Sequence, residues 1–160
     1  MNENFVCTYL KVGTFQVLNN GQKQGGNVAS YFCLGDGRVV HTVPGQTNAD
    51  KLLSESRWAY EIRKSALTHA TDLGTGRVDD KKYRDKIIRG HTERFYAETN
   101  ARHAKSYSPV PLQFPHGRSQ QAQAHWLLAR NPLAKLDAVY PFVWTKILNE
   151  ELSDRPVAKR

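Results

Sequence analysis

Cysteine is scarce in this sequence of 160 residues, which contains only Cys7 and Cys33. The two lie too far apart in the chain to form the Cys-x-x-Cys pair that thiol–disulfide exchange needs. They do not make a disulfide framework, and no histidine lies near them at the spacing of zinc ligands. We therefore expect no cofactor and no metal, and both cysteines to be small apolar residues buried in strands. Cys33 and Cys7 remain the candidate thiols for any catalysis.

Histidine is more frequent, but its positions are scattered. No two histidines have the i, i+4 spacing that places two metal ligands on one face of a helix. We therefore expect surface or structural roles for all six, which are His41, His69, His91, His103, His116 and His125.

The sequence also lacks a long apolar run. No stretch approaches the ~18 residues that a membrane-spanning helix requires. The start of the chain carries Glu3 and no basic stretch, unlike a signal peptide. We therefore expect no membrane span and a cytoplasmic location by default. Aromatic residues are plentiful, and three Trp, seven Tyr and six Phe can help to fill the core of a folded domain.

Charge is unevenly distributed along the chain. Basic and acidic side chains balance in residues 1–80, so residues 81–160 carry the whole net charge of +8. Basic and aromatic residues interleave between positions 81 and 105, a composition that suits contact with phosphates and stacking on bases. It equally suits a solvated helix face with its aromatic residues packed inward. The candidate anion-binding residues are Lys81, Lys82, Arg84, Lys86, Arg89, Arg94, Arg102 and Lys105.

Strand patterns dominate the beginning of the chain. Phe5–Val12 is rich in β-branched and aromatic residues and predicts a strand. Val28–Leu34 and Arg38–Val43 have the same composition and flank a short turn. Asp36 and Gly37 in that turn tolerate positive φ angles, so the sequence predicts a β-hairpin here.

Helical patterns follow the hairpin. Apolar residues from Leu52 to Leu67 recur at helical spacing and predict a helix over about Ala49–Ala70, with Thr47 or Asn48 as its N-cap. The next helix opens at Asp79-Asp80. Its apolar stripe is thin, which predicts a surface helix that is interrupted or weakened at Gly90.

Two more helices are predicted near the end of the chain. Ser119 can cap a short helix that ends before Pro132. Apolar residues from Leu136 to Ile147 recur at helical spacing and predict a last helix. Proline is tolerated only near the start of a helix, so Pro141 predicts a start later than the apolar pattern suggests.

The order of strand, hairpin and amphipathic helix resembles the second half of a thioredoxin-like domain. The resemblance rests on Asn4–Leu10 as an inner strand, Tyr31–His41 as the closing hairpin, and Pro44-Gly45 followed by the Leu52–Leu67 helix. It covers roughly residues 3–70 and implies an α/β fold, with a small sheet covered by the helix and followed by C-terminal helices. The Cys-x-x-Cys pair of such enzymes, and the proline before their hairpin that is usually cis, are absent from this sequence.

These features divide the chain into five expected segments. They are a thioredoxin-like part-domain (1–76), a basic helical segment (77–106), a proline-rich connector (107–117), a C-terminal helical extension (118–152) and a tail (153–160).

The sequence favours a redox-inactive or N-terminally incomplete thioredoxin-like protein, acting as an interaction or structural module with another protein as its partner. For the chain as given it favours the absence of enzymatic activity. One alternative is a basic protein that binds nucleic acid or another polyanion through residues 81–105. Another is a thiol–disulfide enzyme whose active-site motif lies upstream of Met1, where an export signal could also lie.

Overall fold

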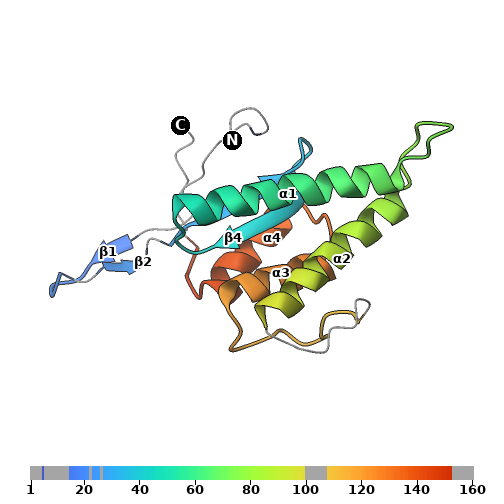
Figure 1. Ribbon diagram of the computed structural model, residues 1–160. Coiled ribbons are helices and arrows are strands. Elements are labelled where there is room, and N and C mark those ends of the chain that lie inside the picture. Colours follow the sequence, from blue (N-terminus) through green and yellow to red (C-terminus); the bar gives the residue numbers. More distant parts are fainter. Residues whose placement is uncertain (1–4, 6–14, 22, 26, 100–107, 153–160) are drawn as a thin grey trace.

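A small antiparallel hairpin and four α-helices make up most of the described chain (Figure 1). Two further short strands, β1 (Phe15–Val17) and β2 (Lys23–Gly25), pair antiparallel and extend away from the helices. This mixture of strands and helices confirms the expected α/β class. The structure is a computed structural model, and it describes residue 5 and residues 15–21, 23–25, 27–99 and 108–152.

The predicted hairpin is present. β3 (Ala29–Cys33) pairs antiparallel with β4 (Val39–Pro44). Gly37 in the connecting turn has a φ of 82°, in the region that favours glycine. All six residues of β4 are buried, so this strand lies inside the molecule rather than at its surface.

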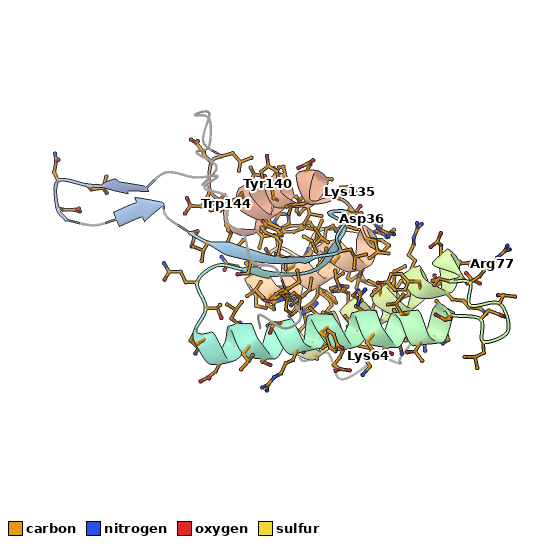
Figure 2. The ribbon with its side chains drawn as sticks, turned by 90° about the horizontal axis from the view of Figure 1, so that it is seen from above. Asp36, Lys64, Arg77, Lys135, Tyr140 and Trp144 are labelled. Atoms are coloured by element: carbon orange, nitrogen blue, oxygen red, sulfur yellow. The ribbon has the colours of Figure 1, made fainter. Side chains whose placement is uncertain are left out.

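Helices cover both faces of the hairpin (Figure 2). On one face, Phe32 and Val43 pack with Ala59 of α1 (Ala49–Ala70). On the other face, Tyr31 packs against the apolar cluster to which the C-terminal helices contribute. Successive strand residues point to opposite faces, and this alternation sends Phe32 and Tyr31 to different helices.

Helix α1 has the predicted bounds. The side chain of Asn48 accepts a hydrogen bond from the backbone N–H of Lys51 at 2.8 Å, which caps the helix as expected. Asn48 is therefore the N-cap, rather than Thr47. The helix buries Ala59, Ala66 and Ala70, small residues that permit close approach to the hairpin and to the next helix.

Helix α2 (Asp80–Glu98) is neither a surface helix nor interrupted at Gly90, so both expectations for it were wrong. Its buried face includes Tyr83, Ile87 and Phe95, and it packs against both α1 and α3. Gly90 is at the crossing with α1, where a Cβ atom would lie 2.6 Å from Cδ1 of Ile62. The close contact that glycine permits compensates for its weak helix propensity.

Helix α3 (Gln120–Arg130) is the most deeply buried helix of the described chain. Ser119 caps it as predicted, by accepting a hydrogen bond from the N–H of Ala122. Every residue from Gln121 to Ala129 is buried. The helix packs against β4, α2 and the C-terminal helical turn, and therefore lies inside the fold rather than appended to it.

The last helix changes its geometry after a proline. α4 (Leu136–Phe142) contains Pro141 and continues as a π-helical turn, η1 (Val143–Ile147). The expectation of a later start was wrong, because the helix begins at Leu136. Pro141 has no N–H for a regular helical hydrogen bond, and the wider turn follows directly after it.

One apolar core joins elements from distant parts of the chain. Val39 of β4, Phe95 of α2, Val110 of the connector and Leu128 of α3 belong to the same buried cluster. These residues come from four of the five segments expected from the sequence. The division into segments stays a prediction, but the described parts of those four share one core.

Some expectations fall outside the described residues. Apart from Phe5, whose ring lies 5.5 Å from that of Phe32, the strand predicted over Phe5–Val12 is not described. Neither is the predicted tail, residues 153–160. In the part of the chain that is described, no helix combines the length and apolar character needed to cross a membrane.

Candidate functional site: a buried histidine cluster

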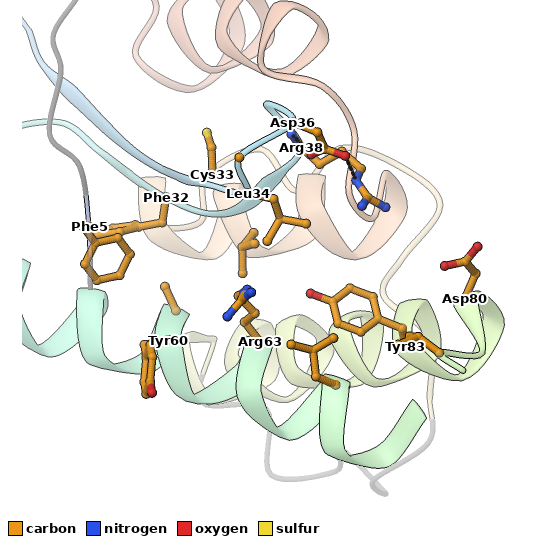
Figure 3. Close-up of a pocket in the computed structure, with 15 residues that line it drawn as sticks. Phe5, Phe32, Cys33, Leu34, Asp36, Arg38, Tyr60, Arg63, Asp80 and Tyr83 are labelled. Carbon is orange, nitrogen blue, oxygen red and sulfur yellow. Dashed lines mark hydrogen bonds and ion pairs between the residues drawn. The ribbon is translucent and has the colours of Figure 1, made fainter. Parts of the chain in front are cut away.

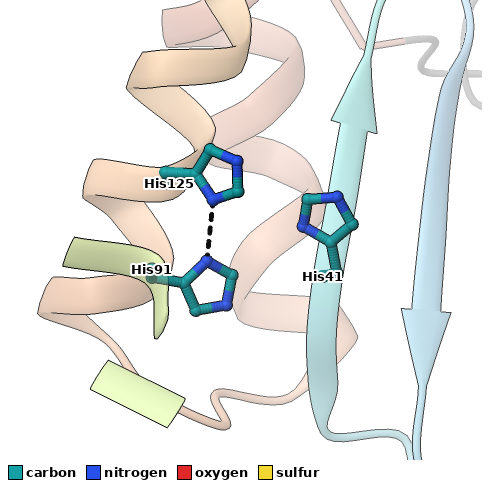
Figure 4. Close-up of side chains that lie close together, drawn as sticks. All are labelled: His41, His91 and His125. Carbon is teal, nitrogen blue, oxygen red and sulfur yellow. Dashed lines mark hydrogen bonds between the residues drawn. The ribbon is translucent and has the colours of Figure 1, made fainter. Parts of the chain in front are cut away.

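Three histidines from three different elements meet inside the fold (Figure 4). His41 comes from β4, His91 from α2 and His125 from α3, and each is 0% exposed. One ring nitrogen from each lies within 4.8 Å of the other two. This is a concentration of imidazole groups that the scattered positions in the sequence did not indicate.

The local sequence explains how each helix presents its histidine. His91 follows Gly90, on the face of α2 that packs inward. His125 lies one turn after Gln121 on α3, whose side chains are buried over nearly the whole helix. The packing of α2 against α3 brings the two rings together.

Hydrogen bonds assign a tautomer to two of the rings. Nε2 of His91 lies 2.9 Å from the carbonyl oxygen of Val40, which can only accept, so Nε2 carries the hydrogen. Nδ1 of His91 is then an acceptor, and Nδ1 of His125, at 2.9 Å, donates to it. Nε2 of His125 is left as an acceptor, 3.4 Å from the amide nitrogen of Gln121.

The third ring is held by a carboxylate. Nε2 of His41 donates to Oε2 of Glu55 at 2.9 Å. The other carboxylate oxygen of Glu55 lies 3.6 Å from Nη1 of Arg94, whose guanidinium is 4.9 Å from the centre of the Trp58 ring. Trp58 in turn contacts all three imidazoles edge-on, with ring centres 4.7 to 5.4 Å apart.

Burial keeps the three imidazoles neutral. It is the largest cause that lowers the pKa of His41, His91 and His125, and the pKa of His91 falls to about 3. The Glu55 carboxylate opposes the shift at His41 without reversing it. Burial alone would raise the pKa of Glu55, but the hydrogen bond from His41 and the nearby positive charges lower it. Glu55 is therefore a carboxylate beside a neutral His41.

Two polar atoms of the cluster are buried without a hydrogen-bond partner. They are Nδ1 of His41 and Oε1 of Gln121. Buried polar atoms are nearly always satisfied, because each unmet hydrogen bond costs about 1–3 kcal/mol. Nδ1 of His41 is on the side of the ring that faces His91 and His125 (Figure 4). Neutral imidazoles with available lone pairs are the ligands that many transition metals bind.

Known proteins give no guide to this cluster. The comparisons find no matching family model, no matching curated protein and no matching solved structure. The role of the cluster has to be inferred from its own geometry.

Cys33 is the only cysteine among the described residues, and it is exposed. The expectation of a buried thiol was wrong for Cys33, which is the last residue of β3 and follows an irregularity in the pairing of β3 with β4. Although the residue is exposed, neighbouring atoms partly shield its thiol, and this burial raises the pKa. Cys7, the second candidate, lies outside the described residues.

A pocket of about 730 Å³ lies between the hairpin and helices α1 and α2 (Figure 3). Phe32, Leu34 and Tyr83 line it, together with Arg38 and Arg63. Cys33 is at its edge, with the sulfur directed away from the cavity in Figure 3. None of the three clustered histidines lines this pocket, so it gives no direct access to them.

The candidate anion-binding residues do not act as one group. Lys81, Lys82 and Arg84 are exposed near the start of α2, as is Arg89 further along, and Lys86 is half-buried. Arg94 instead turns to Glu55 and Trp58, and so belongs to the histidine cluster. The remaining two candidates, Arg102 and Lys105, lie outside the described residues.

Proposed function

We propose that the protein is a redox-inactive, thioredoxin-like module that serves as an interaction or structural domain for another protein. The observation that carries this proposal is the state of Cys33. Thiol–disulfide exchange requires an attacking thiolate, and such thiols are activated by a helix N-terminus or a nearby cation. Burial raises the pKa of the Cys33 thiol, and no charge is among the causes of its shift.

The arrangement of the hairpin supports the thioredoxin-like part of the proposal. β3 and β4 are followed directly by α1, in the order that the resemblance implies. Helices lie on both faces of the hairpin, which suits a strand pair at one side of a layered α/β domain. This agreement concerns architecture, and the proposal of a thioredoxin-like module rests on it together with the residues of the resemblance.

An insulin-reduction assay tests the absence of exchange chemistry. The full chain with dithiothreitol should reduce insulin no faster than dithiothreitol alone, and the Cys33→Ser variant should behave identically. Faster reduction that disappears in the variant would show an active thiol in this chain and overturn the proposal. An active full chain whose activity persists in Cys33→Ser would point to Cys7 and overturn it equally.

A second candidate function is binding of a nucleic acid or another polyanion. The observation that favours it is the exposure of Lys81, Lys82 and Arg84 near the start of α2. Fluorescence anisotropy with a short single-stranded oligonucleotide should then show binding that weakens steeply with added salt. Replacing these three residues with Gln should reduce the affinity, while Lys51→Gln and Lys64→Gln on the exposed face of α1 should not. Absent or salt-insensitive binding would exclude this candidate.

A further inference from the structure

Three neutral imidazoles converge at one buried point, and two of them are already oriented by an acceptor at the far nitrogen. From this arrangement we propose that His41, His91 and His125 bind one divalent transition-metal ion of the Zn²⁺ class through their Nδ1 atoms. This inference does not depend on the thioredoxin-like assignment, because it rests only on the geometry of the cluster.

The distances suit a metal after small ring movements. One nitrogen from each histidine lies within 4.8 Å of the others. Zinc binds imidazole nitrogen at about 2.0–2.1 Å in tetrahedral geometry, which places its ligand atoms roughly 3.4 Å apart. The Nδ1 atoms of His91 and His125, now 2.9 Å apart, would separate by about half an ångström to reach this spacing, while His41 would approach them.

The outer hydrogen bonds resemble those of metal sites. A histidine that ligates through one nitrogen usually donates its other N–H to a carboxylate or a backbone carbonyl, which fixes the ring and its tautomer. His41 donates Nε2–H to Glu55, and His91 donates Nε2–H to the carbonyl of Val40. Two of the three rings therefore already have the tautomer that binding through Nδ1 requires.

The two unsatisfied atoms are explained by the same binding mode. Nδ1 of His41 would become a metal ligand. His125 would have to move its hydrogen from Nδ1 to Nε2, where it needs an acceptor. Oε1 of Gln121 is buried without a partner in the residue that already contacts this nitrogen, and a half-turn of the amide would present it to His125. That half-turn gives up the amide hydrogen bond to the carbonyl of Thr42.

Charge favours an anionic fourth ligand in this buried site. Glu55 and Arg94 carry opposite charges, so the surroundings alone do not neutralise a divalent cation. A metal-bound hydroxide would reduce the excess charge. The three histidines are 0% exposed and come from β4, α2 and α3, so a bound ion would tie these elements together and stabilise the fold.

Metal titration of the full chain tests this proposal. After treatment with a chelator and its removal, the chain should bind one equivalent of Zn²⁺ with a rise in Tm, and Co²⁺ should give the visible absorption of a tetrahedral site. His41→Gln, His91→Gln and His125→Gln should each weaken binding by about 100-fold or more. The matched control His69→Gln, which removes an exposed histidine from α1, should leave it unchanged. No binding, or binding that survives all three substitutions, would overturn the proposal.

Nuclear magnetic resonance of the histidine rings gives a test that needs no variant. Without metal, His125 should carry its hydrogen on Nδ1, while His41 and His91 carry theirs on Nε2. Addition of one equivalent of Zn²⁺ should move the hydrogen of His125 to Nε2 and leave the other two tautomers unchanged. A His125 ring that keeps its Nδ1 hydrogen in the presence of Zn²⁺ would show that this nitrogen does not bind the metal, and would contradict the proposal.

Discussion

The thiol of Cys33 is partly shielded at the end of β3, and its raised pKa has a direct chemical consequence. A raised pKa leaves less thiolate at any given pH, and the thiolate is the species that iodoacetamide alkylates. We predict that Cys33 is alkylated more slowly than free cysteine between about pH 7 and about pH 9, with a rate that still rises at the upper end. Mass spectrometry of the labelled peptides separates Cys33 from Cys7. Rapid labelling at neutral pH that has already levelled off would contradict this prediction.

Glu55 connects the His41 imidazole to the half-buried guanidinium of Arg94. Its carboxylate accepts from His41 and pairs with Arg94, so Glu55→Ala would leave a buried N–H of His41 without an acceptor. We predict a loss of about 2 kcal/mol in the free energy of unfolding, measured by urea denaturation of the metal-free chain. Glu61→Ala, in an exposed position on the same helix, should cost less than about 0.5 kcal/mol. Equal losses for the two variants would show that Glu55 has no special role.

The histidine cluster could not have been predicted from the sequence. His91 and His125 are 34 positions apart, and His91 reaches the carbonyl of Val40 across 51 positions. Sequence spacing detects ligands on one helix, whereas these three come from a strand and two helices. The i, i+4 relation of Gln121 and His125 is a local signal, but a glutamine and a histidine one turn apart are too common to mark a site.

At the scale of helices and strands, the sequence patterns that worked were local ones. The Asp36-Gly37 turn, the Asn48 and Ser119 caps and the apolar stripe of α1 all predicted their elements, because each depends on neighbouring residues. Helix α2 was misjudged because its buried face includes Gly90 and His91, which an apolar pattern does not count. Their burial depends on the helices that pack around them.

Gly90 offers a test of the crossing between α1 and α2. Gly90→Ala adds a Cβ that would lie 2.6 Å from Cδ1 of Ile62, so we predict a destabilisation of about 1 kcal/mol despite the higher helix propensity of alanine. In an Ile62→Ala background, which removes both Cδ1 and the Cγ1 atom that would lie 3.0 Å away, the same substitution should be neutral or stabilising. Urea denaturation of the four proteins in this double-mutant cycle measures both effects. An identical change in both backgrounds would mean that the two side chains do not collide.

At the scale of the whole molecule, the buried histidines make the fold sensitive to acid. Their pKa values are lowered in the folded state, to about 3 for His91, whereas an unfolded histidine titrates near 6.5. Below about pH 6.5 the unfolded chain therefore binds more protons, and the free energy of unfolding falls as the pH falls. We predict a loss of up to about 1.4 kcal/mol per pH unit for each neutral histidine.

Urea denaturation of the metal-free chain between about pH 7.5 and about pH 5 measures this loss, in a range where most carboxylates stay ionised. His69→Gln, which removes an exposed histidine, should show the same pH dependence as the unaltered chain. Constant stability across this range would contradict the assignment of three neutral imidazoles.

The overall architecture was only partly predictable. Composition and pattern indicated an α/β protein, and the hairpin with α1 follows from its own residues. The central position of α3 could not be predicted in this way, because a helix that contains Gln121, Gln123 and His125 is not apolar enough to indicate burial. Its polar side chains can be buried because other elements supply their hydrogen-bond partners. Gln121, for example, donates to the carbonyl of Thr42 in β4.

The turn of the hairpin accepts hydrogen bonds from two residues that come about a hundred positions later in the chain. The N–H of Leu136 donates to the carbonyl of Gly37, and Nζ of Lys135 donates to that of Asp36, a contact that spans 99 positions. During synthesis on the ribosome, the hairpin therefore emerges long before the residues that secure its tip. Until they arrive, the nascent chain must keep β4, all of whose residues are buried in the finished fold, from pairing with other chains.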